Sequence, residues 1–282
     1  MDKILIVTFY FAERAQFEIF GKVTDLFDRI VIFDNTPSET ILASKTEQLD
    51  SKTTIIRNGF NVGLAEAYNH CIKTQKVRAD DIVMLLDQDT TITGHSALKS
   101  YIDRYAKQRK GDEIVGFRGR RLWKKHRRAE KPEAAWVINS GMLFTGQIWM
   151  NVGGFDQSFF VDDVDHEFCM RARDLGVTIS LIQTNAFIHE VGSPKVFRLP
   201  KPFDRISLSS SGHAPWRRYY WAKNRTILLA RHRSLFSILL FGTVLRDLVI
   251  SLAFEDQKLE ILSATVRGFL QSFSALKRLE YV

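Results

Sequence analysis

The sequence predicts an α/β protein with a largely parallel sheet and helices on both faces, followed by a helical C-terminal region. Short apolar runs of strand length alternate with helical patterns up to about residue 90, an order typical of parallel sheets. The fourth run ends at the acidic tripeptide 87–89, at the position where open α/β sheets bind ligands. Residues 215–282 keep a helical periodicity with almost no turn signals.

The elements of the first half follow from local patterns. Strands are predicted at 3–9, 29–34, 53–57 and 82–86, and helices at 12–27, from Thr36 onwards and at 64–76. The helix start at Thr36 is the clearest, because Thr36-Pro37-Ser38-Glu39 combines a Thr cap, a Pro in the first turn and a Glu three residues on.

The second half is less regular. We predict a strand at 135–138, a helix at 164–175 closed by Gly176, a strand at 177–183 and a proline-containing loop at 193–214. We therefore expect a main domain over residues 1–213, with halves of about 1–90 and 91–213, and a helical region over 214–282.

Composition indicates an anionic partner. The net charge is +8 and the pI about 9.5, which fits a nucleotide diphosphate, an anionic membrane surface or nucleic acid. Residues 118–131 alone hold eight Lys or Arg against one Glu. No helix-turn-helix, zinc-finger or RNA-binding signature is present, so we expect no nucleic-acid partner.

Cysteine usage and the N-terminus indicate a cytosolic chain. Cys71 and Cys169 are far apart and form no CxxC pair, so we expect reduced thiols. The first apolar run is too short for a signal peptide. Residues 235–254 are mostly apolar but contain Arg246 and Asp247. A charge at a bilayer centre costs about 2.5–3.5 kcal/mol, so we favour a packed or interfacial helix over a spanning one.

The acidic tip after the fourth strand is the leading candidate site. In an extended chain Asp87 and Asp89 face the same side, and two carboxylates with open positions suit Mg²⁺ or Mn²⁺. An EF-hand loop does not fit, because Ile92 and Leu98 occupy its Gly and Glu positions. An aspartyl-nucleophile phosphatase motif and a simple strand-capping turn remain alternatives.

A second acidic cluster lies between Asp162 and Glu167. Its charges repel one another unless a cation is near, and Arg171, Arg173 or a metal would supply it. Acidic capping of an ordinary helix N-terminus is the alternative.

Six motifs occur in order along the chain: Asn61-Val-Gly-Leu-Ala-Glu-Ala-Tyr-Asn69, Leu85-Leu-Asp-Gln-Asp-Thr90, Ser140-Gly141, Gly153-Gly-Phe-Asp156, Val161-Asp-Asp-Val-Asp-His-Glu-Phe-Cys-Met-Arg171 and Ile188-His-Glu-Val-Gly192. Together they resemble the family 2 glycosyltransferases with the GT-A fold, over roughly residues 1–232. The Asp-Gln-Asp form is most similar to the bacterial rhamnosyltransferase branch.

The resemblance implies roles for individual residues. Asp165 would be the catalytic base, supported by Asp162 or Glu167 because Val164 replaces the usual acidic neighbour. Asp87, Asp89 and His189 would hold Mg²⁺ or Mn²⁺. The remaining expected contacts are to the nucleotide, by Thr8, Tyr10, Asp34, Asn61, Gly63, Asn69 and Gln88, and to the acceptor, by Trp136, Ser140, Gly141 and Trp221.

The resemblance implies an inverting, metal-dependent transferase that moves L-rhamnose from dTDP-rhamnose. A UDP-hexose or UDP-galactofuranose donor stays open. The expected acceptor is a lipid-linked glycan of a bacterial surface polysaccharide or O-antigen, met at the cytoplasmic face of the membrane, where the basic C-terminal helices would contact anionic lipid. The rival classes are the phosphatase and a non-enzymatic basic binding protein; the oligomeric state is left open.

Overall fold

A computed structural model describes residues 1–12, 23–37, 51–108, 112–118, 133–189 and 194–279. The chain forms two compact units. The first comprises Met1–Phe160 and Val164–Glu190, and the second comprises Val161–Asp163 and Val191–Val282.

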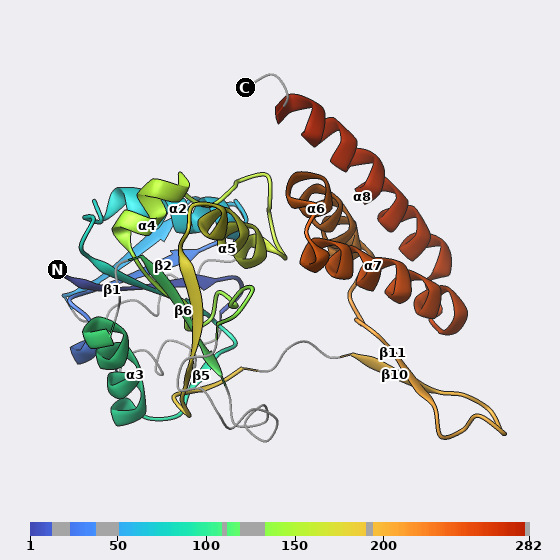
Figure 1. Ribbon diagram of the computed structural model, residues 1–282, viewed down its shortest axis with the longest axis horizontal. Coiled ribbons are helices and arrows are strands. Elements are labelled where there is room, and N and C mark those ends of the chain that lie inside the picture. Colours follow the sequence, from blue (N-terminus) through green and yellow to red (C-terminus); the bar gives the residue numbers. More distant parts are fainter. Residues whose placement is uncertain (13–22, 38–50, 109–111, 119–132, 190–193, 280–282) are drawn as a thin grey trace. The chain divides into compact units, whose positions relative to one another are not determined.

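The first unit is built on a mixed, mostly parallel sheet (Figure 1). Its strands are β1 (Lys3–Phe9), β2 (Arg29–Asp34), β3 (Thr53–Arg57), β4 (Ile82–Asp87), β6 (Glu113–Arg118), β7 (Leu143–Thr145) and β8 (Thr178–Gln183). In the described part of the chain their order is β3-β2-β1-β4-β7-β6-β8, and only β7 runs antiparallel to its neighbours. The predicted fold class is confirmed.

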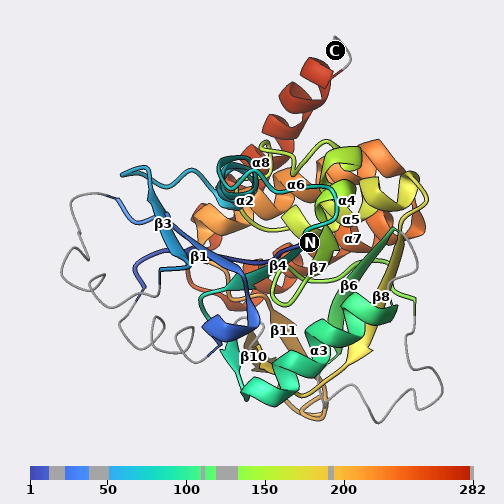
Figure 2. The same ribbon diagram turned by 90° about the vertical axis from the view of Figure 1, so that its left-hand side faces the viewer.

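Helices cover both faces of this sheet. They are α2 (Leu64–Thr74), α3 (His95–Gln108), α4 (Gly146–Val152) and α5 (Val164–Asp174), with a 3-10 turn, η1, at Thr24–Leu26. Because strand residues alternate between faces, Leu5 and Val7 of β1 pack in one buried cluster with Leu98 and Tyr101 of α3. Figure 2 shows α3 on one side of the sheet, and α2, α4 and α5 on the other.

Two predicted elements are wrong. Residues 135–138 form no strand, because pairing with β8 stops after the Glu133–Ser180 bridge. Val137 packs instead over Gly116, where an added Cβ would lie only 2.5 Å from it. Residues 193–214 are not simply a loop: β10 (Lys195–Arg198) and β11 (Ser207–Ser210) form an antiparallel hairpin. Its prolines lie outside the ladder and do not interrupt it.

Several predictions fall wholly or mainly outside the described residues. They are the helix at 12–27, of which only the part around η1 is described, the helix start at 36–39 and the basic stretch at 118–131. The two cysteines are described. Both are buried and unbridged, and burial raises the pKa of each thiol.

The second unit contains the predicted C-terminal helices, α6 (Pro215–His232), α7 (Leu235–Phe254) and α8 (Lys258–Leu279). Pro215 starts α6, and Ser234 and Ser237 form a capping box at the start of α7. Helices α6 and α8 pack closely at Gly268, where an added Cβ would lie 2.4 Å from the Tyr219 carbonyl oxygen. A side chain at this position would push the two helices apart.

Helix α7 is long and apolar enough to cross a membrane, judged by length and composition alone. Its two charged residues form hydrogen bonds with other residues of the second unit. Asp247 is 6 % exposed and accepts a hydrogen bond from the backbone N–H of Ser211 at 2.5 Å. Arg246 donates to the carbonyl oxygen of Ser209 at 3.2 Å. These contacts fit the packed helix favoured from the sequence.

Candidate active site

The acidic tip begins at the last residue of β4. Asp87 is aligned with Thr8 at the end of the neighbouring parallel strand β1. The chain then turns, and the N–H of Thr90 donates to the carbonyl oxygen of Asp87 at 3.1 Å. Asp87 and Asp89 therefore do not share one side of an extended strand, and that prediction is wrong. Asp87 is half-buried, whereas the Asp89 side chain is 63 % exposed.

The Asp87 carboxylate is held on both oxygens. The Tyr68 hydroxyl donates to Oδ1 at 3.1 Å and the Ser140 hydroxyl donates to Oδ2 at 2.8 Å. Burial raises the pKa of Asp87, and the charge of Asp89 raises it further, against the opposing effects of Ser140 and His189. The net shift of the Asp87 pKa is upward, because the hydrogen bond from Ser140 and the charge of His189 do not offset burial and the charge of Asp89.

The raised pKa predicts that the Asp87 charge costs stability at neutral pH. The folded state binds the proton more tightly than the unfolded state, whose pKa is about 3.9. This residue therefore favours folding most below that value, and the effect is lost as the pH rises through the raised folded pKa. We expect metal-free Asp87→Asn to melt above the wild type at neutral pH, by about 2–4 °C per kcal/mol relieved.

Scanning calorimetry from acidic to neutral pH measures this difference. The gap should close as the pH falls towards the unfolded-state value. Asp80→Asn, in the exposed turn just before the same strand, is the matched control and should show no such trend. A neutral-pH melting temperature of Asp87→Asn below that of the wild type would contradict the interpretation.

A short antiparallel ladder brings His189 to the tip. Strand β5 (Thr91–Ile92) pairs with β9 (Phe187–Ile188). His189 Nδ1 lies 2.9 Å from Thr90 Oγ1, which lies 2.7 Å from Ser140 Oγ. Nδ1 is also 3.6 Å from Asp89 Oδ1. A continuous hydrogen-bonded chain thus links Asp87, Ser140, Thr90 and His189.

The predicted nucleotide residues gather at the same edge of the sheet. Asp34 ends β2 and is buried; its carboxylate accepts from the Arg57 Nε–H at 3.2 Å and the Thr36 N–H at 3.0 Å. Tyr10 and Gln88 exchange two hydrogen bonds, of 2.7 and 3.1 Å, between the Gln88 amide and the Tyr10 backbone. The ends of β1, β2 and β4 therefore lie side by side.

The turn before α2 is fixed by short contacts. Gly63 has a φ of +84°, and its N–H donates to Asn61 Oδ1 at 2.9 Å. An added Cβ on Gly63 would lie 2.6 Å from the Phe160 carbonyl oxygen. The Asn69 amide is bonded to the backbone of Phe155 at both polar atoms, each at 2.8 Å. The nucleotide roles of these residues stay predictions, since the observed contacts are all made within the protein.

Asp165 lies in the first turn of α5 and is 9 % exposed. Its Oδ1 accepts from the N–H of His166 at 2.8 Å and lies 3.0 Å from His166 Nδ1. The His166 ring packs on Trp136, with the ring centroids 4.2 Å apart. A buried carboxylate beside an imidazole and a half-buried indole can accept a proton in a sheltered position.

The other predicted residues of this region have partners of their own. Glu167 is fully buried and holds Arg171 with both oxygens, at 2.5 and 2.6 Å. Ser140 lies against Asp87, and the Gly141 carbonyl oxygen accepts from the Tyr101 hydroxyl at 2.6 Å. The supporting and acceptor-binding roles of Glu167, Ser140 and Gly141 stay predictions.

Asp162 and Trp221 belong to the second unit. Asp162 forms an ion pair with Arg217 at 2.7 Å. Trp221 lies under the Arg225 guanidinium, whose central carbon is 4.2 Å from the ring centroid. Their predicted roles, in supporting the base and in binding the acceptor, likewise stay predictions.

The donor set at the tip suits a divalent cation. In the described ranges no group of three or more His, Cys, Asp or Glu side chains is arranged to hold a metal ion. Asp87 and Asp89 nevertheless form an acidic pair, and burial together with the charge of Asp89 raises the pKa of Asp87. Two hard carboxylates with open positions fit Mg²⁺ or Mn²⁺ bound together with substrate phosphates.

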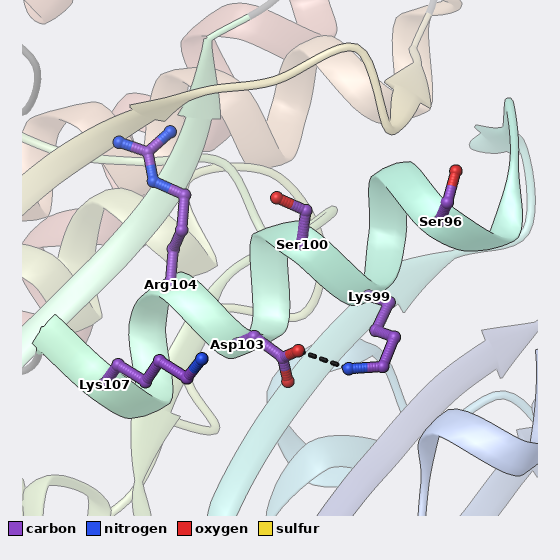
Figure 3. Close-up of a pocket in the computed structure, with 6 residues that line it drawn as sticks. All are labelled: Ser96, Lys99, Ser100, Asp103, Arg104 and Lys107. Atoms are coloured by element: carbon purple, nitrogen blue, oxygen red, sulfur yellow. Dashed lines mark hydrogen bonds and ion pairs between the residues drawn. The ribbon is translucent and has the colours of Figure 1, made fainter.

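A separate cavity lies along α3 (Figure 3). It has a volume of about 370 Å³, and the residues that line it are Ser96, Lys99, Ser100, Asp103, Arg104 and Lys107. All come from one helix, and Lys99 pairs with Asp103 at 2.5 Å. None of them is a predicted site residue, so this cavity is not the candidate active site.

Comparison with known proteins decides the family. The model of glycosyl transferase family 2 matches residues 14–165, more than half of the chain. The chain belongs to this family. A GT-A fold accounts for the mixed, mostly parallel sheet. Membership of a glycosyltransferase family sets aside the phosphatase and non-enzymatic alternatives.

The relatives agree with this assignment. The chain is 25 % identical over 221 residues to the dTDP-rhamnosyl transferase RfbF of Shigella flexneri, covering 72 % of this chain and 71 % of that one. The mannosyltransferase PcManGT of Pyrobaculum calidifontis, solved with GDP-Man and Mn²⁺, superposes with a TM-score of 0.57 at 13 % identity, covering 96 % and 86 %. GalNAc-T7, solved with UDP, GalNAc and Mn²⁺, gives 0.53 at 10 %, covering 89 % and 57 %. The chain is therefore similar in sequence to a rhamnosyl transferase, and the two solved structures show the fold alone.

Proposed function

We propose that this glycosyltransferase moves L-rhamnose from dTDP-rhamnose, with inversion, onto a lipid-linked glycan of a bacterial surface polysaccharide or O-antigen. The observation that carries the proposal is the hydrogen-bonded acidic tip at the carboxyl end of β4, aligned with Thr8 on the neighbouring strand. The dTDP-rhamnose donor is supported by the similarity to RfbF.

In the proposed reaction the tip receives the donor diphosphate. Asp87 and Asp89 would hold a divalent ion, with His189 completing the site. When bound, such an ion neutralises the negative charge that the leaving diphosphate gains. Tyr68 and Ser140 keep the Asp87 carboxylate in one orientation, because each donates to a different oxygen. Asp34, Tyr10 and Gln88 would contact the nucleoside from the adjacent strand ends.

Asp165 would act as the general base. A sugar hydroxyl is a poor nucleophile, and a carboxylate that removes its proton during attack makes it reactive. If the attack comes from the face opposite the diphosphate, the anomeric centre inverts. The His166 ring beside Asp165, packed on Trp136, limits the positions that the carboxylate can take.

The C-terminal helices would contact the membrane that carries the acceptor. Large apolar side chains of α7 and α8 are exposed, among them Leu235, Leu239, Val249, Leu259 and Leu270. Together with the net charge of +8, they support peripheral binding to an anionic lipid surface at the cytoplasmic face. Sedimentation of the chain with anionic but not with neutral vesicles tests this point.

A screen of nucleotide sugars tests the donor, with mass spectrometry of the products in the presence of Mn²⁺ and of EDTA. We expect transfer from dTDP-rhamnose, and loss of transfer in EDTA. Cleavage of none of the donors would overturn the proposed function. Full activity in EDTA would overturn its metal dependence alone.

Ligand-induced stabilisation tests the metal residues without relying on turnover. Mn²⁺ and dTDP together should raise the melting temperature of the wild type, because binding at 100 times Kd adds about 2.7 kcal/mol to stability. Asp89→Ala should lose most of this increase, since it removes an exposed ligand but no packing. The matched control is Asp80→Ala, in the turn just before β4. An equal increase in Asp89→Ala and the wild type would remove Asp89 from the metal site.

A further inference from the structure

The segment just before α5 has an unusual backbone. Asp162 and Asp163 both have positive φ values, of 59° and 57°. Side chains with a Cβ disfavour this left-handed conformation, and two such residues in succession need the surrounding structure to hold them. Asp165, the candidate base, follows Asp163 by two residues, in the first turn of the helix that starts at Val164.

Three side chains of α6 hold this segment, and all the contacts lie within the second unit. The Arg217 guanidinium donates to the Asp162 carboxylate at 2.7 and 3.0 Å. Arg225 Nε donates to Asp163 Oδ2 at 3.1 Å. The Asn224 amide donates to the carbonyl oxygens of Val161 and Asp162, each at 2.8 Å. Both carboxylates and two backbone carbonyls are therefore fixed from one helix.

The pair of Arg225 and Asp163 is the more rigid of the two ion pairs. The Arg225 side chain is 11 % exposed and that of Asp163 2 %, whereas the Arg217 side chain is 41 % exposed. Arg225 also packs over the Trp221 ring at 4.2 Å and donates to the Leu240 carbonyl oxygen at 3.2 Å. A buried, charge-assisted contact made by an already fixed guanidinium resists rearrangement.

We propose that Arg225 is a positioning residue for the transfer reaction. Its ion pair with Asp163 fixes the left-handed backbone from which α5 begins, and this backbone sets the direction of the Asp165 carboxylate. The inference rests on the proposed function, because it gives Asp165 the role of base. Arg225 touches neither donor nor acceptor in this scheme. Its effect is therefore on turnover rather than on donor binding.

Three variants distinguish the effect of losing the Arg225–Asp163 ion pair from the effect of changing the backbone conformation at residue 163. Arg225→Gln removes the charge, Arg225→Lys keeps it, and Asp163→Gly suits the positive φ but cuts the pair. Arg246→Gln is the control, because this exposed guanidinium contacts Ser209 and not the 161–163 segment. The measurements are kcat with dTDP-rhamnose, the Kd of dTDP with Mn²⁺, and the melting temperature of each full-length variant.

We expect Arg225→Gln and Asp163→Gly each to lower kcat by about 10- to 100-fold, with dTDP affinity within about twofold of the wild type. Arg225→Lys should lose less, and the double variant Arg225→Gln/Asp163→Gly should be no slower than its slower parent, because the two residues act as one unit. A kcat near that of the wild type in folded Arg225→Gln and Asp163→Gly overturns the proposal, as does a loss of dTDP affinity that matches the loss of kcat.

The variant Asp165→Asn distinguishes failure of the positioning role of Arg225 from failure of the proposed role of Asp165 as the base. If Asp165→Asn is inactive while the Arg225 and Asp163 variants turn over normally, only the positioning role is wrong. If Asp165→Asn itself turns over normally, Asp165 is not the base, and the positioning role fails with it.

Discussion

Replacing Asp165 by Asn is expected to slow sugar transfer by about 10²- to 10⁴-fold, the usual contribution of a general base. Asparagine has the same shape as aspartate but cannot accept the acceptor's proton. The side chain is 13 % exposed and lies beside His166, so water has little access to take over its role. Donor affinity should change little, because the diphosphate is assigned to Asp87 and Asp89.

Steady-state kinetics with saturating acceptor give kcat, and calorimetric titration of dTDP with Mn²⁺ gives donor affinity. Asp174→Asn, at the exposed last turn of the same helix, is the matched control and should behave like the wild type. A loss of dTDP binding in Asp165→Asn would place this carboxylate on the donor side and remove it as the base. Unchanged turnover would move the base role to another residue.

Predictions from the sequence succeeded where a local pattern was enough. The alternation of strand and helix fixed β1 to β4 and α2 to within a residue or two, because apolar periodicity and turn residues act over short distances. The same reasoning predicts a loop in place of the β10–β11 hairpin, because it counts nearby prolines as evidence against strands. It made no assignment to α3, β6, β7 or α4.

The contacts of the site could not be read from the sequence, because their partners lie far apart along the chain. Tyr68 holds Asp87 from 19 residues away, and Ser140 does so from 53. The signal for Tyr68 was present, since a buried tyrosine hydroxyl needs a partner. The pairing of Arg225 with Asp163 spans 62 residues, and no local pattern marks it. The turn at Gln88 was only an alternative to an extended tip, since an apolar strand pattern does not specify the backbone of the polar residues that follow it.

Replacing Arg218 should have the largest effect on stability. Arg218 is 2 % exposed and forms ion pairs with Asp247 and with Glu255, the second at 2.7 Å. It also donates to the Ser251 hydroxyl and the His213 carbonyl oxygen, both at 2.8 Å. Arg218→Met keeps an apolar stem but leaves two buried carboxylates without this cation. We expect a loss of about 3–5 kcal/mol, the usual cost of breaking a buried ion pair from one side.

Denaturation followed by far-ultraviolet circular dichroism measures this loss, and Arg246→Met on the surface of α7 should stay within about 0.5 kcal/mol of the wild type. Adding Asp247→Asn and Glu255→Gln to Arg218→Met should recover much of the stability, because no buried charge then remains unpaired. If the triple variant is as unstable as Arg218→Met, lost packing rather than stranded charge is the cause.

The pH dependence of the wild type offers an independent test of the same cluster. Burial would raise the pKa of Glu255, but hydrogen bonds from Lys195 and Ser251 and the charge of Arg218 outweigh it and lower the pKa to about 2. The stabilisation is complete above the ordinary glutamate value of about 4.3 and is lost as the pH falls through the folded pKa. Arg218→Met should therefore lose less stability than the wild type on acidification, since one of the cations that depress this pKa is gone. Asp247 within α7 and Glu255 at its C-cap thus connect α6 to α7 through Arg218. Acid should weaken these ion pairs before it weakens the apolar packing around them.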